Sequence, residues 1–490
     1  MAQVHYIQDP KKSAEHEETI VLEYNDMTAQ EKLQDKKLLR KIDLLILPLA
    51  TLNYFFSSMD RNDIGNAKLA GFQTDNHLTN LGYSTVVAVF YAGYIPFQLV
   101  GGLGIRKVQP YIQLGLANIV WGIASIMMLF SKSIILPSLM RVLIGAAEGI
   151  TQVNSVFLTM WYTPREYAVR TGAWYSCGVL AGTFNGLIAY GIQTNIHSSV
   201  FKSWQLIYLV EGCLPIGFGI VFIWLYPPTP ELVKKFFSEE EKKLVIERTR
   251  RARNTPGESV TLKGAVSAFR QPHLYGMCLI YFCIIWTVSG YGAFLPSIIN
   301  GLGFTRVLSQ LLTVPITFAG FASVWVFCIW SDRVRKRGIF LVCLSVTAFI
   351  GYLILVIVPS IVAPRLVGLV LISIGIQPMV PLALTWLYTN TVGLSRRAMS
   401  IPLQNISGQL GGLAVSFTFV DPPRYFNGNL ATLILLSVLI FTVVLCELYF
   451  VTQNRRKAAH KVADPAWVAE NQIKSYAELG TDHPDFMYEN

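Results

Sequence analysis

Charge is scarce in this sequence. Asp, Glu, Lys and Arg make up 14% of its 490 residues, whereas 52% are hydrophobic. A soluble protein carries about a quarter charged residues. The apolar residues also form long runs, and runs of about 20 apolar residues are typical of membrane-spanning helices. The composition therefore excludes an ordinary soluble domain and predicts an all-α polytopic membrane protein.

The patterns of enzymes and metal proteins are also lacking. The seven cysteines all lie in apolar runs, and none has the paired spacing of a zinc site or a redox motif. We find no phosphate-binding loop and no nucleophile elbow. We therefore expect no enzymatic activity, no metal and no cofactor, and we interpret the cysteines as small buried hydrophobic residues.

Twelve apolar runs define the predicted organisation. Residues 1–41 hold no apolar core, so they show no cleavable signal peptide and are interpreted as a cytosolic tail. Two sets of six runs follow, at 42–226 and 274–452, separated by a polar loop at 227–273 and followed by a second cytosolic tail at 453–490. The polar loop cannot cross a bilayer, so it divides the chain into halves. The predicted spans cover residues 42–67, 81–103, 111–130, 134–160, 168–192, 205–226, 274–300, 306–330, 338–358, 365–389, 397–419 and 428–452.

Lys and Arg are distributed unevenly between the two sides of this arrangement. If both termini lie in the cytosol, 32 of the 40 Lys and Arg residues fall on the cytosolic side. Such a bias is typical of the cytosolic loops of membrane proteins. The net charge of +10 is then explained by orientation in the lipid bilayer. We therefore expect no nucleic-acid partner.

Ionisable residues inside the predicted spans are few, so each is a candidate for function. All seven histidines fall in tails, loops or span edges, which leaves carboxylates as the candidate proton carriers. Arg61, in the first span, can bind a carboxylate ligand by charge-assisted hydrogen bonds, and the adjacent Asp60 can take up a proton in a half-dry cavity. In the alternative interpretation the helix ends near Met59, and these charges are solvated. Asp63 is interpreted as a solvated group near the outer surface.

Glu148 lies in the middle of the fourth predicted span. Small residues at 145–147 and 149 leave space around it for close helix packing or for a cavity. Arg141 is seven residues earlier on the same helical face, roughly 10 Å away, which is too far for a direct ion pair. Glu148 therefore needs another partner or a proton. We interpret it as a proton-carrying carboxylate, with a structural link to a neighbouring helix as the alternative, and Arg141 as structural.

Other polar residues are weaker candidates. Asp332 and Arg333 lie at a predicted helix end in a basic loop, where they would anchor the cytosolic face or form a gate. Gln409 has glycines on both sides that leave room for a ligand. Glu211 is interpreted as a buried, hydrogen-bonded structural acid. Further candidate substrate contacts are Tyr91, Tyr94, Trp386 and Asn390.

Motifs in several predicted helices carry a family resemblance. The first span ends in "MDRNDIGNAKLAG", the fourth contains "MRVLIGAAEGITQVNSVFLTMWYTPRE", the sixth begins "SWQLIYLVEGCLP", and the tail reads "LGTDHPDFMYEN". From about residue 40 to residue 490 the chain resembles the fungal allantoate permease-like branch of the anion:cation symporters, within the major facilitator superfamily. The resemblance implies twelve helices in two six-helix halves. It also implies proton-coupled import of a small organic anion, such as a nicotinate, allantoate or pantothenate class carboxylate, across the plasma membrane.

The resemblance assigns the substrate carboxylate to Arg61 and proton coupling to Asp60 and Glu148. Departures occur at Tyr94 and Gln409, where the branch often has other polar residues, so we expect an unfamiliar substrate. An exporter or organelle carrier with the same fold is the alternative function, because helices do not reveal direction. A non-transporting nutrient sensor is a third. A monomer is the default for this architecture.

Overall fold

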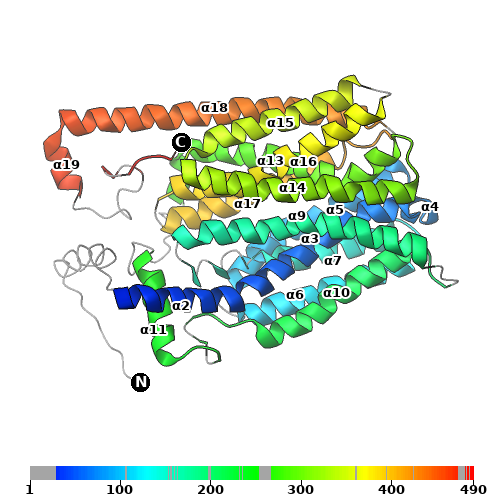
Figure 1. Ribbon diagram of the computed structural model, residues 1–490, viewed down its shortest axis with the longest axis horizontal. Coiled ribbons are helices and arrows are strands. Elements are labelled where there is room, and N and C mark those ends of the chain that lie inside the picture. Colours follow the sequence, from blue (N-terminus) through cyan, green and yellow to red (C-terminus); the bar gives the residue numbers. More distant parts are fainter. Residues whose placement is uncertain are drawn as a thin grey trace.

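The computed structural model of the chain is almost entirely helical (Figure 1). It describes residues 29–472 and 481–489, apart from 105–107, 153, 155–156, 159–160, 163, 197–199, 231, 234, 253–265, 359–360, 393, 423, 482 and 485. No strand occurs among the residues so described. All statements below concern this part of the chain.

Long helices run side by side through the bundle (Figure 1). In the amino-terminal half they are α3 (Leu47–Leu69), α5 (Asn80–Gly104), α6 (Pro110–Met127), α7 (Ile135–Thr151), α9 (Pro164–Asn195) and α10 (Ser203–Leu225). In the carboxyl-terminal half they are α13 (Pro272–Asn300), α14 (Arg306–Val334), α15 (Arg337–Ile357), α16 (Val362–Asn390), α17 (Leu394–Val415) and α18 (Phe426–Ala463). Shorter helices are α2 (Ala29–Leu45), α4 (Phe72–Asp75), α11 (Glu239–Ala252) and α19 (Pro465–Gln472).

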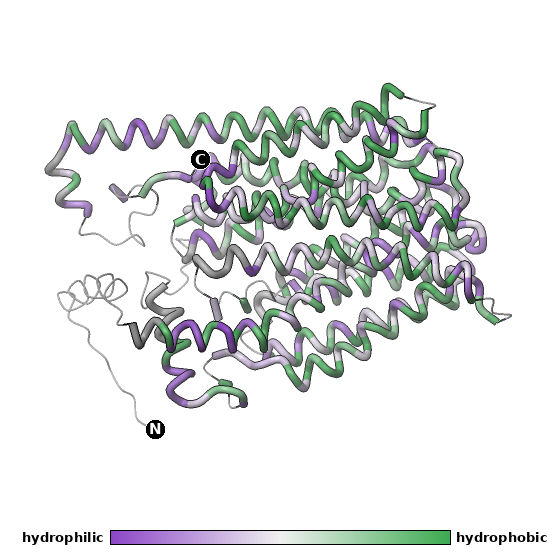
Figure 2. The backbone as a smooth tube through the Cα atoms, viewed as in Figure 1, coloured by the Kyte–Doolittle hydropathy of each residue, from purple (hydrophilic) through white to green (hydrophobic). Residues whose placement is uncertain are grey.

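Eight helical segments of the described chain are long and apolar enough to cross a membrane, and one of them joins α2 and α3. The other four predicted spans correspond to α5, α7, α9 and α17, which lie among the first eight in the bundle (Figure 1). Apolar residues dominate the middle of the bundle, and polar residues gather near the ends (Figure 2). Large apolar side chains such as Trp224 and Phe441 are exposed on the outside, as expected of a lipid-facing surface.

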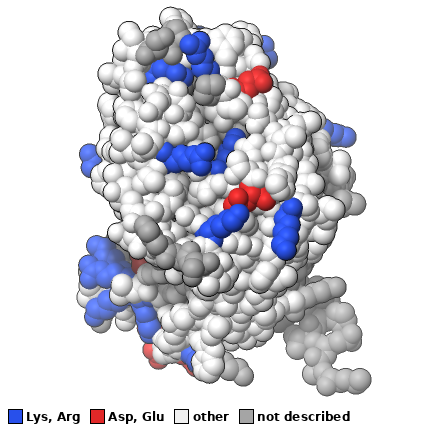
Figure 3. Space-filling model, turned by 90° about the vertical axis from the view of Figure 1, so that its right-hand side faces the viewer, with Lys and Arg blue, Asp and Glu red and all other residues white. Residues whose placement is uncertain are grey.

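The two ends of the bundle differ. The end that carries α2, α11 and α19 is called the tail end below, and the opposite end, beside α4, the far end (Figure 1). At the tail end, Lys41 of α2 forms an ion pair with Glu241 of α11, with 2.7 Å between Nζ and Oε2. The far end carries scattered basic side chains on a mostly uncharged surface (Figure 3).

Helices α5 and α7 cross with their backbones almost in contact. A Cβ atom placed on Gly145 would lie 2.0 Å from the carbonyl oxygen of Phe90, and one on Gly93 would lie 2.0 Å from that of Val142. Small residues allow such close approach in membrane helices. The crossing fixes the position of α7, which carries Glu148 one turn further along.

The two halves are closed against each other at the far end. A Cβ atom on Gly65 of α3 would lie 2.8 Å from the carbonyl oxygen of Ala293 of α13. The Gln310 amide donates to the Asn66 carbonyl oxygen at 3.2 Å. Lys68 donates to the Tyr425 hydroxyl at 3.3 Å. Among the described residues, hydrogen bonds between the halves lie at this end or at the level of the cavity described below.

Candidate functional site

A cavity of about 190 Å³ lies between the two halves of the bundle. Helices from both halves line it, and its walls combine one accessible arginine, several amides and many aromatic rings. Its lining includes Tyr54, Arg61, Tyr91, Tyr94, Trp174, Tyr175, Tyr281, Ser289, Gln377 and Gln409. Ligand sites between the two halves are typical of membrane carriers built from repeated bundles.

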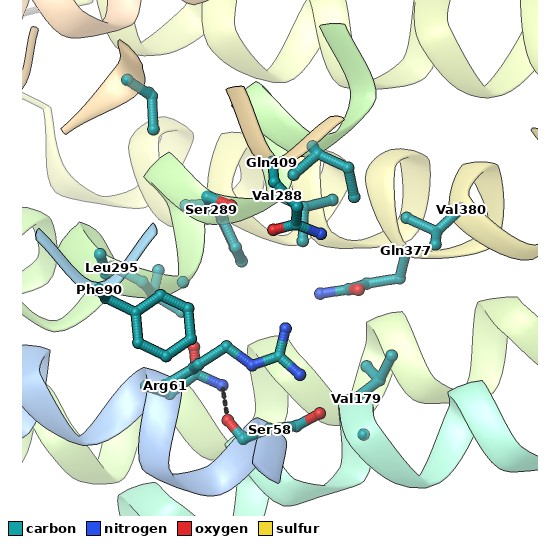
Figure 4. Close-up of a pocket in the computed structure, with 18 of the residues that line it drawn as sticks. Ser58, Arg61, Phe90, Val179, Val288, Ser289, Leu295, Gln377, Val380 and Gln409 are labelled. Atoms are coloured by element: carbon teal, nitrogen blue, oxygen red, sulfur yellow. Dashed lines mark hydrogen bonds between the residues drawn. The ribbon is translucent and has the colours of Figure 1, made fainter. Parts of the chain in front are cut away.

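Arg61 supplies positive charge to this cavity. Its guanidinium points from α3 into the space beneath Gln377 and Gln409 of the opposite half (Figure 4). Its side chain is 27% exposed, and Nη2 donates to the Ser57 hydroxyl at 2.9 Å. The helix continues past Arg61 to Leu69, so the alternative of a solvated helix end is wrong.

Glu148 pairs with Arg61, although the two residues lie on different helices. Arg61 Nε is 3.0 Å from Glu148 Oε2, and the Ser57 hydroxyl donates to the same oxygen at 2.6 Å. The Glu148 side chain is 0% exposed, so the carboxylate of this ion pair is buried, whereas the guanidinium faces the cavity. A ligand carboxylate that binds Arg61 would compete with Glu148 for the guanidinium.

Asp60 pairs with Arg141 instead of its sequence neighbour Arg61. Asp60 Oδ2 is 3.4 Å from Arg141 Nη1, and Asp60 Oδ1 accepts a hydrogen bond from Ser125 at 2.8 Å. Asp60 and Arg141 are both almost fully buried, beside the cavity wall. Two ion pairs, Arg61 with Glu148 and Arg141 with Asp60, therefore connect α3 to α7.

Side-chain amides and hydroxyls connect the cavity walls across the two halves. The Tyr91 hydroxyl donates to the Ser289 hydroxyl oxygen at 3.1 Å, and the Tyr175 hydroxyl donates to Gln377 Oε1 at 3.3 Å. Gln409 lies opposite Arg61, close to Ser289 (Figure 4). These groups can donate and accept hydrogen bonds around a bound molecule.

Aromatic rings surround the arginine. The Arg61 guanidinium carbon is 5.8 Å from the ring centre of Tyr54 and 5.7 Å from that of Tyr94. Tyr54 packs against Trp174, with 4.0 Å between ring centres. Rings at this spacing favour a flat apolar ligand group next to the charge.

Two predicted substrate contacts lie elsewhere. Trp386 and Asn390, at the tail end of α16, bind the carboxyl-terminal segment: the Trp386 indole and the Asn390 amide each donate to the Glu489 carbonyl oxygen at 2.9 Å. Neither residue lines the cavity. Both residues lie near the tail end of the 29-residue helix α16, which places them beyond the depth of the cavity.

The predicted gate residues lie at the tail end of α14. Asp332 Oδ1 is 3.3 Å from Arg337 Nη2, and Arg337 Nε also lies 3.2 Å from Glu489 Oε2. Arg333 is exposed. The aspartate thus pairs with the fifth residue after it, and the carboxyl-terminal segment shares that arginine.

Two acids differ from their sequence interpretations. Asp63 is 0% exposed instead of solvated, because α3 turns it toward the interior of its own half. Glu211 is buried as expected, but neither of its carboxyl oxygens has a hydrogen-bond partner among the described residues. Gln377 and Tyr54 were missed as functional candidates, and Arg141 was interpreted as structural. Intrahelical spacing gives no signal for them, because their partners lie on other helices.

The fold and the cavity agree with comparisons to known proteins. The family profile of the Major Facilitator Superfamily matches residues 50–416. The chain belongs to this superfamily. The predicted fold class and superfamily are thereby confirmed. The protein is a multi-pass membrane transporter and not an enzyme.

Individual relatives support this assignment. This chain is 31% identical over 460 residues to the "High-affinity nicotinic acid transporter" of Saccharomyces cerevisiae. The alignment covers 93% of this chain and 85% of the yeast protein. This chain is also 29% identical to an uncharacterized transporter of Schizosaccharomyces pombe, over 95% of each chain. A solved proton:xylose symporter superposes with a TM-score of 0.65 at 15% identity and covers 84% of this chain and 95% of its own. That likeness shows the fold.

Proposed function

We propose that this transporter imports a small organic anion together with protons across the plasma membrane, with both termini in the cytosol. The observation that carries the proposal is the Arg61–Glu148 pair at the wall of the cavity. A substrate carboxylate can replace Glu148 on the accessible guanidinium. Glu148 would then be a buried carboxylate without its cation, and such groups are neutralised by binding a proton.

This exchange couples the substrate to a proton. An anion on Arg61 favours protonation of Glu148, and loss of that proton returns Glu148 to Arg61 and expels the anion. Asp60, held by Arg141 and Ser125, is the second proposed coupling carboxylate. The tail end faces the cytosol in this proposal, because basic residues concentrate in the tails and the loop of that end. The far-end closure then corresponds to a conformation that faces inward.

The cavity also supports a class of substrate. Tyr54, Tyr94 and Trp174 supply aromatic surface near Arg61, and Gln377 and Gln409 supply amides on the opposite wall. A flat ring that bears a carboxylate and a hydrogen-bonding atom suits this arrangement. The relative named for nicotinic acid makes pyridine carboxylates the first compounds to test.

The test begins with ligand-induced thermal stabilisation of the purified transporter. Pyridine carboxylates, ureides and pantothenate are screened, and the strongest ligand is used for uptake into proteoliposomes. Arg61→Ala should weaken binding by about 10-fold to 100-fold, because a charge-assisted hydrogen bond is worth about 1.5–3 kcal/mol. Arg306→Ala, which removes an exposed arginine at the start of α14, is the matched control and should leave binding unchanged.

Proton coupling is tested on the two carboxylates. Glu148→Gln and Asp60→Asn should abolish uptake driven by a pH gradient, while substrate exchange between two equal pools persists. Wild-type pH dependence in both variants would refute the proton assignment. Unchanged affinity in Arg61→Ala would refute the anion site.

A further inference from the structure

A carboxyl group lies inside the first half without a hydrogen-bond partner. Asp63, on α3, is 0% exposed, and neither of its side-chain oxygens has a partner among the described residues. The amide of Asn185 is a polar neighbour, but its nitrogen donates to the Met59 carbonyl oxygen at 3.0 Å and its oxygen accepts from Asn66 at 3.0 Å. Asp63 is therefore buried with no hydrogen bond or ion pair to either carboxyl oxygen among the described residues, and Asn185 and Arg141 are the neighbours that favour its charged form.

Among the described residues, Arg141 is the one cation that acts on Asp63. Asp60 lies one turn before Asp63 on α3. Arg141, on α7, interacts electrostatically with Asp63. From α9 comes the neutral Asn185, and from α10 the Tyr208 hydroxyl, which is itself buried without a hydrogen-bond partner in the described chain. Helix α13 meets α3 near this level through the Ala293 backbone, which carries no charge.

The first half buries more carboxyl groups than arginines among its described residues. The carboxyls belong to Asp60, Asp63, Glu148 and Glu211, and the arginines that pair with two of them are Arg61 and Arg141. An uncompensated carboxylate in a low-dielectric interior is costly, and a carboxyl in that position binds a proton instead. Of these four, Asp63 and Glu211 are the carboxyls that form no ion pair among the described residues.

Asp63 differs from Glu211 in its relation to Arg141. Asp63 follows Asp60 by three residues, so both lie on one face of α3. Arg141 binds Asp60 through Nη1 at 3.4 Å. One guanidinium therefore acts electrostatically on both carboxyls, and its Nε has no hydrogen-bond partner among the described residues.

We propose that Asp63 is a second proton-binding site, coupled to Asp60 through Arg141. Arg141 stabilises one of the two carboxyls as a carboxylate, and the other holds the proton. In this structure Asp60 is the carboxylate and Asp63 the acid. When the proton moves from Asp63 to Asp60, Arg141 changes its partner to Asp63, and the charge of the three groups is unchanged. Asp63 thus serves as a proton reservoir for Asp60, which is the step that rests on the proposed function.

Infrared difference spectroscopy tests whether Asp63 carries a proton. The full-length transporter in detergent is measured in its resting state, and the carbonyl stretch of protonated carboxyl groups is recorded. Asp63→Asn should lose one such band. Asp75→Asn is the control, because Asp75 pairs with Lys202 and accepts from the Trp204 indole, and it should lose none. An unchanged carbonyl region in Asp63→Asn overturns the proposal.

A second variant tests the coupling. In Asp60→Asn the guanidinium of Arg141 is free to bind Asp63, so the Asp63 band should disappear although Asp63 is present. Glu211→Gln should leave the Asp63 band in place. Persistence of the Asp63 band in Asp60→Asn overturns the coupling. If Asp63→Asn fails to fold, Asp63→Glu keeps the carboxyl and should shift the band, whereas an unshifted band overturns the assignment. These spectra involve no substrate. Failure of the Asp63 proposal is therefore distinguishable from failure of the transport proposal, which is measured by uptake.

Discussion

Substitution of Gly145 by alanine is expected to impair transport although the residue touches no substrate. The added Cβ would lie 2.0 Å from the Phe90 carbonyl oxygen, and real contacts of this kind are not shorter than 3.0 Å. Helices α5 and α7 must therefore separate by about 1 Å, because a close-packed interior has no space to absorb the atom. Helix α7 carries Glu148, and α5 carries Tyr94, which lies against Arg61.

The size of the effect follows from this displacement. Overpacking in a close-packed interior costs about 1–3 kcal/mol of stability. A shift of about 1 Å in a positioning group can reduce a rate about 100-fold. We therefore expect Gly145→Ala to melt at a lower temperature and to show an initial uptake rate far below that of the wild type, even when the amount of folded protein is matched.

The assay compares initial uptake into proteoliposomes with thermal unfolding of the same preparations. Gly191→Ala, in α9, is the matched control, since no atom lies within 4 Å of its added Cβ. Alanine there should be neutral or stabilising by up to about 1 kcal/mol. Wild-type melting and uptake in Gly145→Ala would refute the argument that the α5–α7 crossing positions Glu148.

Three further predictions concern other contacts. Burial raises the pKa of Glu241, but hydrogen bonds from Lys41 and Ser238 outweigh it and leave the pKa below its usual value; the stabilisation of α11 is therefore present above the unfolded pKa of about 4.3. This stabilisation is lost as the pH falls through the folded pKa of Glu241, so amide exchange in α11 should become faster over that pH range. In Lys41→Met, amide exchange in α11 should be fast already at neutral pH. Lys68→Met should favour opening of the far end roughly fivefold in spin-label distance measurements, because the hydrogen bond from Lys68 to the Tyr425 hydroxyl of the other half, worth about 1 kcal/mol, is lost. An unchanged distance distribution would contradict this. Tyr488→Ala should destabilise the fold by about 3 kcal/mol, since its ring stacks on Phe450 at 4.9 Å, whereas alanine at the exposed position 487 should not.

The fold was predictable from the sequence because the bilayer requires long apolar runs, which are a property of single segments. The place of Arg61 in a cavity was predictable for a similar reason: a charge inside a span needs a polar environment. Tyr91, Tyr94 and Gln409 also line the cavity as expected.

The pairing of charges was not predictable from one sequence. Adjacency in the sequence placed Asp60 beside Arg61, and spacing along α7 left Glu148 without a partner. Both partners come from across the α3–α7 contact, which sequence spacing does not encode. The burial of Asp63 was missed because the direction in which a polar helix face turns depends on which helix packs against it.

The docked carboxyl-terminal segment has a consequence for the order of biosynthesis. Tyr488 and Glu489 contact α15, α16 and α18, all of which leave the ribosome before them. The second half therefore enters the membrane before the Trp386 indole and Arg337 Nε have formed their contacts with Glu489. The packing of this half is complete only after Tyr488 and Glu489 have been synthesised, so their docking can serve as a marker of a fully packed second half.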